Sequence, residues 1–301
     1  MSKLLAFHCC AKLNLSLDVT GKRPDGYHTL ESIFQSVGVY DDIEIQIDDG
    51  NSLTFECNLP DLPTDERNLA VKATLAFLKY SGKQAKIDIH LQKNIPSGAG
   101  MGGGSADAAG VIYALNILFE TNYSKETLCE IGLQVGADVP FILMGGTAYV
   151  EGIGEIIQPL RPLPEIPVVV LKGKESVSTP VAYRAIDALE SPAHPDTKAM
   201  LQAIDTQNIQ TLCENCGNLF EQAIQCDEVN LAKKSLLENG ASCAVMTGSG
   251  SAVFGLFPDA DMQTVQKIAE QLSGQFDFAK STKLVSQSFD IVRQSEKGGN
   301  S

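Results

Sequence analysis

The chain has 301 residues, of which 44% are hydrophobic and 20% are charged, and its formal net charge at pH 7 is −14. This length suffices for sizeable hydrophobic cores and favours two domains of ordinary size. The negative balance argues against general binding to nucleic acids or anionic membranes, because phosphate-rich surfaces need a basic partner. No apolar run approaches the roughly 18 residues of a membrane span, so we expect a soluble globular protein.

The first predicted element is a strand over residues 6–19, in which apolar and polar side chains alternate. The alternation predicts a half-buried strand with Lys12 and Asn14 on its polar face, where one ligand can contact both. A solvated sheet face is the alternative, unless the pair lies beside the glycine-rich loop described below. The apolar run Leu4 to Ala11 is interrupted by His8, so we expect no signal peptide and a cytoplasmic protein.

Several further elements precede the glycine-rich loop. A Pro-Asp-Gly turn lies within residues 20–28, and Tyr27 and His28 at its exit either contact a ring-shaped ligand or simply pack. The remaining elements are strands over 37–48 and 52–57 that pair as a meander, an amphipathic helix over 67–80 with Asn68 as its cap, and a strand over 85–92.

Five glycines follow within seven positions, before a predicted helix over residues 106–119. They are Gly98, Gly100, Gly102, Gly103 and Gly104. Glycine costs folding entropy, so such a cluster indicates backbone at positive φ, or backbone that lies bare against a ligand. The N-terminus of the following helix favours an anion. We therefore predict a phosphate-binding loop, and a flexible surface loop without a ligand is the plain alternative.

Two known kinds of nucleotide loop fit this stretch poorly. The Walker loop needs a Lys immediately before the helix, where this chain has Gly104, Ser105 and Ala106. The dinucleotide fingerprint G-x-G-x-x-G is matched in spacing, and Glu120 follows at a suitable distance. However, the predicted helix continues unbroken to Phe119, so Glu120 would end a helix rather than a second strand. We interpret the fingerprint as accidental.

The segment between residues 124 and 167 is predicted to complete a first domain. Ser124 caps a helix over 125–135, and Asp138 lies in the next turn, where an isolated Asp is typically a helix cap or turn former. Residues 145–160 form a hairpin, and the Pro-rich stretch 159–167 is the best linker. We therefore place an N-terminal domain at residues 1–160 and a C-terminal domain at residues 161–301.

The second half of the chain predicts an α+β arrangement. Its elements are a buried strand over 168–171, helices from Thr179 onward and over 197–225, 227–239 and 260–273, strands within 241–257 and near 283–293, and a frayed tail over 294–301. Thr179 is read as the cap of the first of these helices and Pro180 as its first residue. The turn from Thr247 to Ser251 is either a second anion site or a plain hairpin turn.

Eight cysteines are spread through apolar segments and are expected to be reduced. Cys213 and Cys216 form a C-x-x-C pair, but neither a second pair of ligands nor a thioredoxin-like strand accompanies them. We therefore predict no site at which protein side chains alone hold a metal.

Three stretches together resemble the kinases of galactose, homoserine, mevalonate and phosphomevalonate, the GHMP kinase family. They are Ala11 to Asn14, Pro96 to Ala109 and Thr247 to Gly250, and their order and spacing fit nearly the whole chain. Residues 11–32, the triple glycine and residues 136–141 are most similar to the branch of the family that phosphorylates a cytidine diphosphate-linked methylerythritol in the non-mevalonate isoprenoid pathway.

The resemblance implies a two-domain α+β fold with the active site in the cleft between the domains, and ATP-dependent phosphoryl transfer to the 2-hydroxyl of the methylerythritol group. Asp138 is implied to accept the hydroxyl proton, and Lys12 to lie beside it and favour its ionised form. ATP and Mg²⁺ are the implied cofactors, and the implied partner of the monomer or homodimer is a small molecule. The residues implied to hold ATP are Asn68, Pro96, Ser97, Gly98, Ala99, Gly100, Met101, Gly102, Gly103, Gly104, Ser105 and Ala106.

The substrate residues are carried over from the family in the same way. Asn14 is implied to contact the erythritol part and His28 to hydrogen-bond the cytosine edge. The residues implied to complete this set are Tyr27 and Tyr183, which flank the cytosine ring, and Thr179.

Two positions of the loop depart from the commonest family pattern. Met101 stands where Leu is usual, and Ala106 where a second Ser is usual. Ser105 is then the loop side chain able to reach a phosphate or Mg²⁺.

Three alternatives remain open at this point. A sister kinase acting on homoserine or a mevalonate compound would keep the glycine-rich loop but lack the block Asp25 to His28, which this chain has. A dinucleotide-dependent oxidoreductase would bind NAD(H) in preference to ATP. A non-catalytic nucleotide-binding module would need neither Lys12 nor Asp138.

Overall fold

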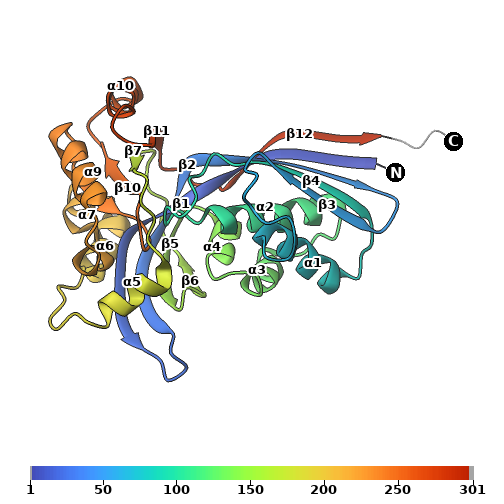
Figure 1. The fold of residues 1–301 in the computed structure, drawn as a ribbon, viewed down its shortest axis with the longest axis horizontal. Helices are drawn as coiled ribbons and strands as arrows, with labels where there is room; N and C mark the ends of the chain where they lie inside the picture. The colour runs from blue at the N-terminus through green and yellow to red at the C-terminus, as the bar shows by residue number, and fades with distance from the viewer. Residues whose placement is uncertain (1, 298–301) are drawn as a thin grey trace.

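The computed structural model describes residues 2–297, which form two β-sheets with helices packed against them (Figure 1). The N-terminal sheet has eight strands, five of them in the order β12-β1-β2-β4-β3. Its strands are β1 (Ser2–Lys22), β2 (His28–Asp48), β3 (Ser52–Cys57), β4 (Lys86–Gln92), β5 (Thr147–Gly152), β6 (Ile156–Pro159), β8 (Gly217–Asn218) and β12 (Phe289–Lys297). The predicted α+β class is confirmed.

Four helices cover one face of this sheet (Figure 1). They are α1 (Leu69–Ser81), α2 (Gly103–Leu118), α3 (Lys125–Leu133) and α4 (Val139–Met144). Asn68 caps α1, because its side chain accepts a hydrogen bond from the backbone N–H of Ala70. Ser124 caps α3 in the same way, through the N–H of Thr127. Both caps agree with the sequence-based predictions.

The second sheet has four strands in the order β11-β7-β10-β9. They are β7 (Pro167–Lys172), β9 (Cys243–Met246), β10 (Val253–Leu256) and β11 (Phe278–Lys283). The helices of this half are α5 (Thr179–Ile186), α6 (Thr197–Thr206), α7 (Ile209–Asn215), α8 (Phe220–Ala223), α9 (Asp227–Glu238) and α10 (Met262–Leu272). Strands β9 and β10 pair antiparallel, which confirms the predicted strand-turn-strand unit.

The long hairpin of β1 and β2 runs through both halves of the molecule (Figure 1). Its side chains are buried on both faces from Cys9 to Val19, so the prediction of a half-buried strand was wrong. The reason is that the glycine-rich loop and the turn at Thr247 and Gly248 cover the polar face and hydrogen-bond Lys12 and Asn14. Alternation along one strand indicates its two faces but not what covers the second.

Three predictions of strand pairing and extent were also wrong. Strand β3 pairs parallel with β4 and lies outside it, because α1 carries the chain from one to the other, so β2 and β3 form no meander. The predicted last strand is two strands, β11 in the second sheet and β12, which pairs with β1. Residues 294–297 belong to β12 rather than to a frayed tail, and residues 298–301 lie outside the described residues. The division of the chain at residue 160 stays a prediction.

The predicted helix over 197–225 is broken into three short helices and a short strand. Gln207 adopts a left-handed conformation, with φ 55°, and Asn208 then starts α7 by accepting a hydrogen bond from the N–H of Thr211. Gly217 and Asn218 form β8, which pairs parallel with β1. Helix α5 also differs slightly, because Thr179 is its first residue and Ser178 occupies the cap position.

We expect truncation of Phe289 to destabilise the protein through the contact between β12 and the rest of the N-terminal sheet. Its ring stacks on Tyr113 of α2, with centroids 4.2 Å apart, and meets Phe7 of β1 edge-on at 6.2 Å. Because the side chain is only partly buried, Phe289→Ala should lower the free energy of unfolding by about 2 kcal/mol, less than the roughly 3–5 kcal/mol typical of a fully buried Phe. Urea denaturation measures this change. Val292→Ala on the same strand, where the side chain is 61% exposed, should change it by no more than about 0.5 kcal/mol. Equal losses in the two variants would contradict the assignment.

Candidate active site

The glycine-rich loop joins β4 to α2 with an unusual backbone. Gly98, Gly100 and Gly102 have φ values of 61°, 74° and 71°, which confirms the prediction of positive φ in this loop. Gly102 is the cap residue of α2, and no side chain caps the helix. The N–H groups of its first turn are therefore not paired with a capping side chain, and together with the helix dipole they favour an anion.

The loop lies directly against β1 and against the turn between β9 and β10. The backbone oxygen of Met101 accepts a hydrogen bond of 3.0 Å from the N–H of Lys12. A Cβ atom at Gly100 would lie 2.0 Å from the backbone oxygen of Thr247, so only glycine fits there. The loop is thus held by protein on the side of β1, and does not project into solvent there.

Lys12 and Asp138 lie together, as the family resemblance implied. The Lys12 ammonium is 3.7 Å from the Asp138 carboxylate, and their side chains are 5% and 31% exposed. Asp138 occupies the cap position of α4 but makes no side-chain capping bond. Its carboxylate therefore faces Lys12 rather than the helix, which argues against a purely structural role as a cap.

Lys12 is buried among groups that restrict its position. Its ammonium donates a 2.8 Å hydrogen bond to Oδ1 of Asn14 and lies 4.7 Å from the centre of the Phe34 ring. Burial lowers the pKa of Lys12, and the nearby Asp138 carboxylate opposes this effect without cancelling it. The ammonium is thus held in place next to one carboxylate.

Asn14 connects this pair to the turn between β9 and β10. Its Oδ1 also accepts hydrogen bonds from the N–H of Gly248 at 2.9 Å and from Oγ1 of Thr247 at 3.2 Å. Its Nδ2 donates to Oγ of Ser32 at 2.9 Å. The Asn14 amide is therefore engaged largely with the protein itself, and its predicted contact with a substrate stays a prediction.

Two cavities meet at the glycine-rich loop. The first, which we call the loop cavity, has a volume of about 270 Å³ and is lined by residues 96–104 together with Leu62, Pro63, Arg67, Asn68, Leu69, Lys93, Ile95 and Asp107. The second, the lysine cavity, has about 190 Å³, and its lining includes Lys12, Asn14, Phe34, Asp138, Thr179 and Tyr183. Gly100 and Gly102 line both cavities, so the two are separated by little more than bare backbone.

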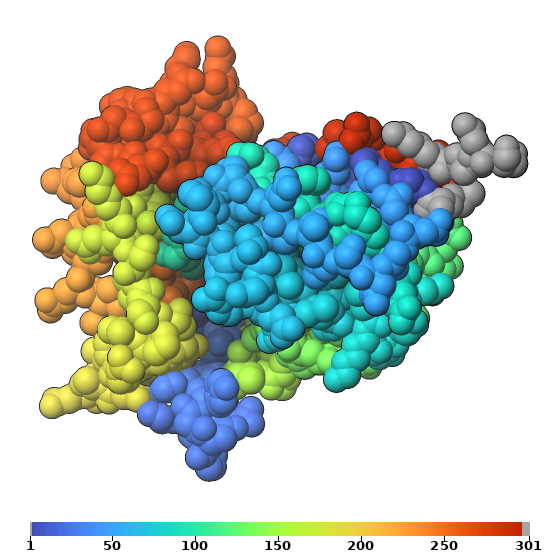
Figure 2. Space-filling model, turned by 45° about the vertical axis from the view of Figure 1, so that its right-hand side comes forward, coloured from blue at the N-terminus to red at the C-terminus, as the bar shows by residue number. Residues whose placement is uncertain are grey.

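The lysine cavity lies between the two halves of the molecule. Its lining takes residues from β1 and β2, from α5 and from the turn at Gly248 and Ser249. In Figure 2 a recess separates the yellow segment around α5 from the cyan and green N-terminal part, and the tip of the β1–β2 hairpin borders it.

The predicted substrate residues are only partly brought together. The ring of His28 stacks on Tyr183, with centroids 4.7 Å apart, and its Nε2 lies 2.7 Å from the carboxylate of Asp187. Tyr27 is 62% exposed and lines neither cavity. Thr179 lies in the lysine cavity and hydrogen-bonds Ser249.

The residues predicted to hold ATP are likewise only partly brought together. Those from Pro96 to Gly104, and Asn68, all line the loop cavity. Ser105 is partly exposed and Ala106 fully buried, and neither lines that cavity.

Sequence reasoning missed a buried ionic group beneath the loop, formed by Asp41, Lys93 and Asp107. Lys93 and Asp107 line the loop cavity. A signal existed, because Asp107 is the one acidic residue in an otherwise apolar helix, and an Asp there needs a partner. Asn218 was also missed; its Nδ2 donates to the backbone oxygens of Met246 and Gly248 and so positions the same turn.

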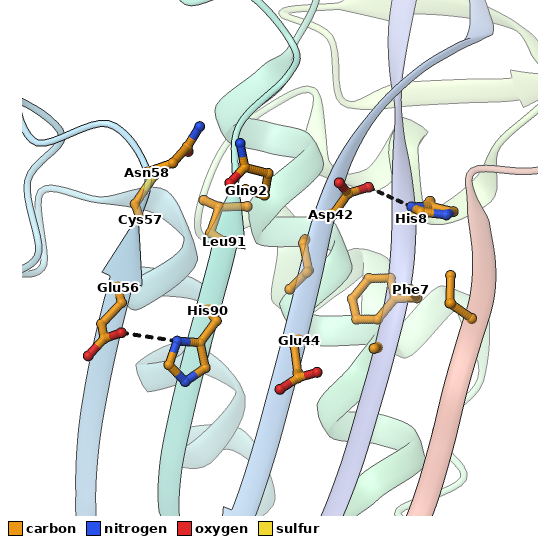
Figure 3. Close-up of a pocket in the computed structure, with 13 residues that line it drawn as sticks. Phe7, His8, Asp42, Glu44, Glu56, Cys57, Asn58, His90, Leu91 and Gln92 are labelled. Atoms are coloured by element: carbon orange, nitrogen blue, oxygen red, sulfur yellow. Dashed lines mark hydrogen bonds and ion pairs between the residues drawn. The ribbon is translucent and has the colours of Figure 1, made fainter.

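A larger hollow, of about 560 Å³, lies on the face of the N-terminal sheet opposite α2 (Figure 3). It contains two histidine–carboxylate pairs, His8 with Asp42 at 2.6 Å and His90 with Glu56 at 3.1 Å. These side chains are 40% or more exposed, and none of the predicted site residues lines the hollow. We therefore place the candidate site at the glycine-rich loop.

Among residues 2–297 there is no group of three or more His, Cys, Asp or Glu side chains that could hold a metal ion. All eight cysteines, Cys213 and Cys216 included, are free thiols. Within the described part of the chain, no helix combines the length and the apolar character needed to cross a membrane.

Comparison with known proteins defines the class to which this fold and site belong. The model for the GHMP kinases N terminal domain matches residues 68–146, and the model for the GHMP kinases C terminal domain matches residues 200–277. The chain belongs to the GHMP kinase family, and it is therefore a phosphotransferase.

Several curated relatives carry the name 4-diphosphocytidyl-2-C-methyl-D-erythritol kinase. The protein of that name from Clostridium perfringens is 41% identical over 277 residues, which cover 89% of this chain and 93% of the relative. The one from Caldicellulosiruptor bescii is 40% identical over 264 residues, covering 87% and 92%.

Solved structures give the same fold. A crystal structure of 4-(cytidine 5'-diphospho)-2C-methyl-D-erythritol kinase is similar with a TM-score of 0.78 and 32% identity, and the match covers 93% of this chain and 99% of that one. A homoserine kinase from Cytophaga hutchinsonii follows with a TM-score of 0.76 at 19% identity, covering 96% and 97%. The homoserine kinase shows a shared fold alone.

We expect Gly100→Ala to destabilise the protein more than another substitution at positive φ. Gly82, at the end of α1, has φ 66° but no atom within 4 Å of an added Cβ, so Gly82→Ala should cost only the backbone strain of about 1–2 kcal/mol. At Gly100 the clash with Thr247 adds about 1–3 kcal/mol. Urea denaturation of both variants tests this difference. Equal losses would show that the loop does not need its close contact with the β9–β10 turn.

Proposed function

We propose that this kinase transfers the γ-phosphoryl group of ATP to the 2-hydroxyl of 4-diphosphocytidyl-2-C-methyl-D-erythritol, in the non-mevalonate pathway to isoprenoid precursors. The names of the relatives support this substrate, since they are about 40% identical over most of the chain. We also propose that the enzyme acts in the cytoplasm, as a monomer or a homodimer, where ATP is available and its free thiols remain reduced.

The observation that carries the proposal is the shared wall of the two cavities. Gly100 and Gly102 line both, so the two cavities adjoin at residues without side chains, where a phosphate from the loop cavity and a hydroxyl in the lysine cavity can come together. Phosphoryl transfer requires the donor phosphate and the acceptor oxygen roughly in line, with little covalent chemistry left to the protein. Adjoining cavities of this kind provide such positioning.

Asp138 and Lys12 then act on the acceptor hydroxyl. Asp138 accepts the proton as the hydroxyl oxygen attacks the γ-phosphorus, a role that contributes about 10²–10⁴-fold in rate. The Lys12 ammonium lies 3.7 Å from this carboxylate and is proposed to orient the acceptor hydroxyl. It also carries positive charge close to the transferring group.

The loop cavity is proposed to hold ATP, with its phosphates at the first turn of α2 and its base toward Asn68. The described residues provide no cluster of carboxylates, so the protein side chains alone do not fit a Mg²⁺ ion. Mg²⁺ usually keeps several waters and binds nucleotide phosphates with one or two protein oxygens. Ser105 is the loop side chain proposed to reach the phosphates or a bound Mg²⁺, which would neutralise charge on the phosphates, while Asp138 serves the acceptor hydroxyl.

The cytidine end of the acceptor is proposed to bind near α5. Tyr183 offers an aromatic face for the cytosine ring, and His28 offers hydrogen bonds to its edge, with Tyr27 on the other side. In the present arrangement His28 covers the face of Tyr183, so the base enters beside this stack or displaces His28. Asn14 and Thr179 are proposed to contact the erythritol part.

The alternative is another small-molecule kinase of the same family, acting on homoserine or a mevalonate compound. The shared fold with a homoserine kinase and a mevalonate kinase keeps this alternative in view. The long similarity to the cytidine-linked branch argues against it. A dinucleotide-dependent oxidoreductase or a non-catalytic nucleotide-binding module would not require Lys12 and Asp138 to meet.

A phosphorus NMR assay with ATP, Mg²⁺ and 4-diphosphocytidyl-2-C-methyl-D-erythritol tests the proposed reaction. A new phosphomonoester signal is expected, and Asp138→Asn should lower kcat by about 10²–10⁴-fold, because the base is lost while the shape is kept. Asp205→Asn, an exposed carboxylate on α6, is the matched control and should leave kcat unchanged. Turnover of homoserine or mevalonate in preference to the cytidine-linked substrate would overturn the assignment, as would full activity of Asp138→Asn.

The pH dependence of kcat should carry the signature of Lys12. Because burial lowers its pKa more than Asp138 restores it, kcat should fall at alkaline pH, with a limb below the ordinary lysine pKa of about 10.4. The sign follows from the loss of the ammonium charge as the pH rises through that pKa. Lys12→Arg keeps its charge, so whatever activity it retains should show no such limb. An unchanged alkaline limb in this variant would contradict the role of Lys12.

A further inference from the structure

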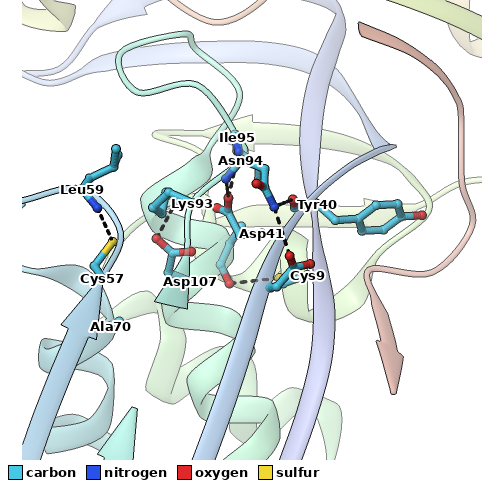
Figure 4. Close-up of polar contacts among 12 residues, drawn as sticks. Cys9, Tyr40, Asp41, Cys57, Leu59, Ala70, Lys93, Asn94, Ile95 and Asp107 are labelled. Carbon is cyan, nitrogen blue, oxygen red and sulfur yellow. Dashed lines mark hydrogen bonds and ion pairs between the residues drawn. The ribbon is translucent and has the colours of Figure 1, made fainter. Parts of the chain in front are cut away.

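Beneath the glycine-rich loop lies a buried group of three charged side chains, Asp41 of β2, Lys93 after β4 and Asp107 of α2 (Figure 4). The Lys93 ammonium contacts the carboxylates of both Asp41 and Asp107, the second at 2.8 Å. The three side chains are 5%, 0% and 5% exposed for Lys93, Asp41 and Asp107. One cation thus serves two carboxylates in an almost fully buried site.

This ionic group connects both ends of the loop to the sheet. Oδ1 of Asp41 accepts hydrogen bonds from the N–H groups of Asn94 and Ile95, at 2.6 and 2.8 Å, where the loop begins. Asp107 belongs to α2 just after the loop ends, and a Cβ at Gly103 would lie 3.3 Å from the Lys93 ammonium. Lys93 therefore links the chain entering the loop to the helix that leaves it.

The electrostatic balance of the group depends on Lys93. Burial lowers the pKa of Lys93, but the two carboxylates outweigh it and raise that pKa overall. Burial also raises the pKa of Asp107 well above its usual range, only partly offset by Lys93. Without the ammonium, Asp41 and Asp107 would face each other unneutralised, which is strongly unfavourable in a buried site.

Two further observations point from this group to the loop cavity. Lys93 and Asp107 line the cavity, although they are almost fully buried. Oδ1 of Asp107 is buried without a hydrogen-bond partner among the described residues. A group that only supported the fold would be expected to satisfy its polar atoms and to lie away from the cavity.

We propose that Lys93, held between Asp41 and Asp107, is a positioning residue for nucleotide binding, because it fixes the start of the glycine-rich loop relative to the first turn of α2. The inference rests on the proposed function, since it assigns the nucleotide to the loop cavity. Lys93 does not act on the acceptor: it sets the spacing of the backbone N–H groups that receive the phosphates. Loss of its charge should therefore weaken nucleotide binding and leave acceptor binding intact.

The test is isothermal titration calorimetry of ATP binding without the acceptor. Lys93→Met keeps the length of the side chain and removes the charge, and it should raise the Kd for ATP by about tenfold or more. The KM for the acceptor, measured at saturating ATP, should stay within about twofold, since positioning of the loop affects the donor side. Lys86→Met at the start of β4, whose lysine pairs with Asp88 on the surface, is the matched control and should leave both values unchanged.

A double variant separates the loss of the link made by Lys93 from the repulsion between the two carboxylates. The double variant Lys93→Met/Asp107→Asn removes the repulsion but leaves the link between the start of the loop and α2 missing, so its Kd for ATP should stay raised by about fivefold or more. A return to the wild-type Kd would show that charge balance alone matters and would overturn the inference.

The outcomes separate this inference from the proposed function. If the wild type does not bind ATP, both fail. If it binds ATP and a folded Lys93→Met variant keeps the wild-type Kd, only the present inference is overturned. Should Lys93→Met not fold, Asp107→Ala decides: it keeps the pair of Lys93 with Asp41 but removes the link to α2, so its Kd for ATP should rise, and an unchanged Kd would overturn the inference.

Discussion

The close approach of bare backbone at Gly100 to the turn at Thr247 is the contact on which the rest of the site depends. These two segments are far apart in the chain, and no side chain fits between them. Their contact places the loop against β1, where Lys12 and Asp138 meet, and makes the loop the common wall of two cavities. The donor side and the acceptor side thereby adjoin at residues without side chains. A Cβ atom at Gly102 would lie 3.1 Å from Cγ of Lys12 and would crowd this junction.

Two buried lysines on either side of this wall differ in the charge they face. Lys12 faces the carboxylate of Asp138 alone, and burial lowers its pKa. Lys93 contacts two carboxylates, and its pKa is raised. The first can therefore change its charge more readily with its surroundings, which suits a residue next to reacting groups. The second stays charged, which suits one that holds a loop in place. The number of neighbouring carboxylates accounts for the difference.

Much of the site could be predicted because its signals are local. A cluster of glycines before a helix indicates positive φ, and the structure has it at Gly98, Gly100 and Gly102. Alternation along β1 placed Lys12 and Asn14 on one side, and their side chains do hydrogen-bond each other. The pairing of Lys12 with Asp138 came only from resemblance to a family, since no local pattern relates residues so distant in sequence.

The sequence by itself determined the local elements: the caps at Asn68 and Ser124, the glycine-rich loop and most strands and helices, because each follows from residues close along the chain. Only the tertiary structure decided which strands pair, as with β3 beside β4 and β12 beside β1. It alone decided that both faces of β1 are covered and that Asp41, Lys93 and Asp107 meet beneath the loop. The physical reason is that burial and ion pairing depend on distances between segments, which a one-dimensional pattern does not contain.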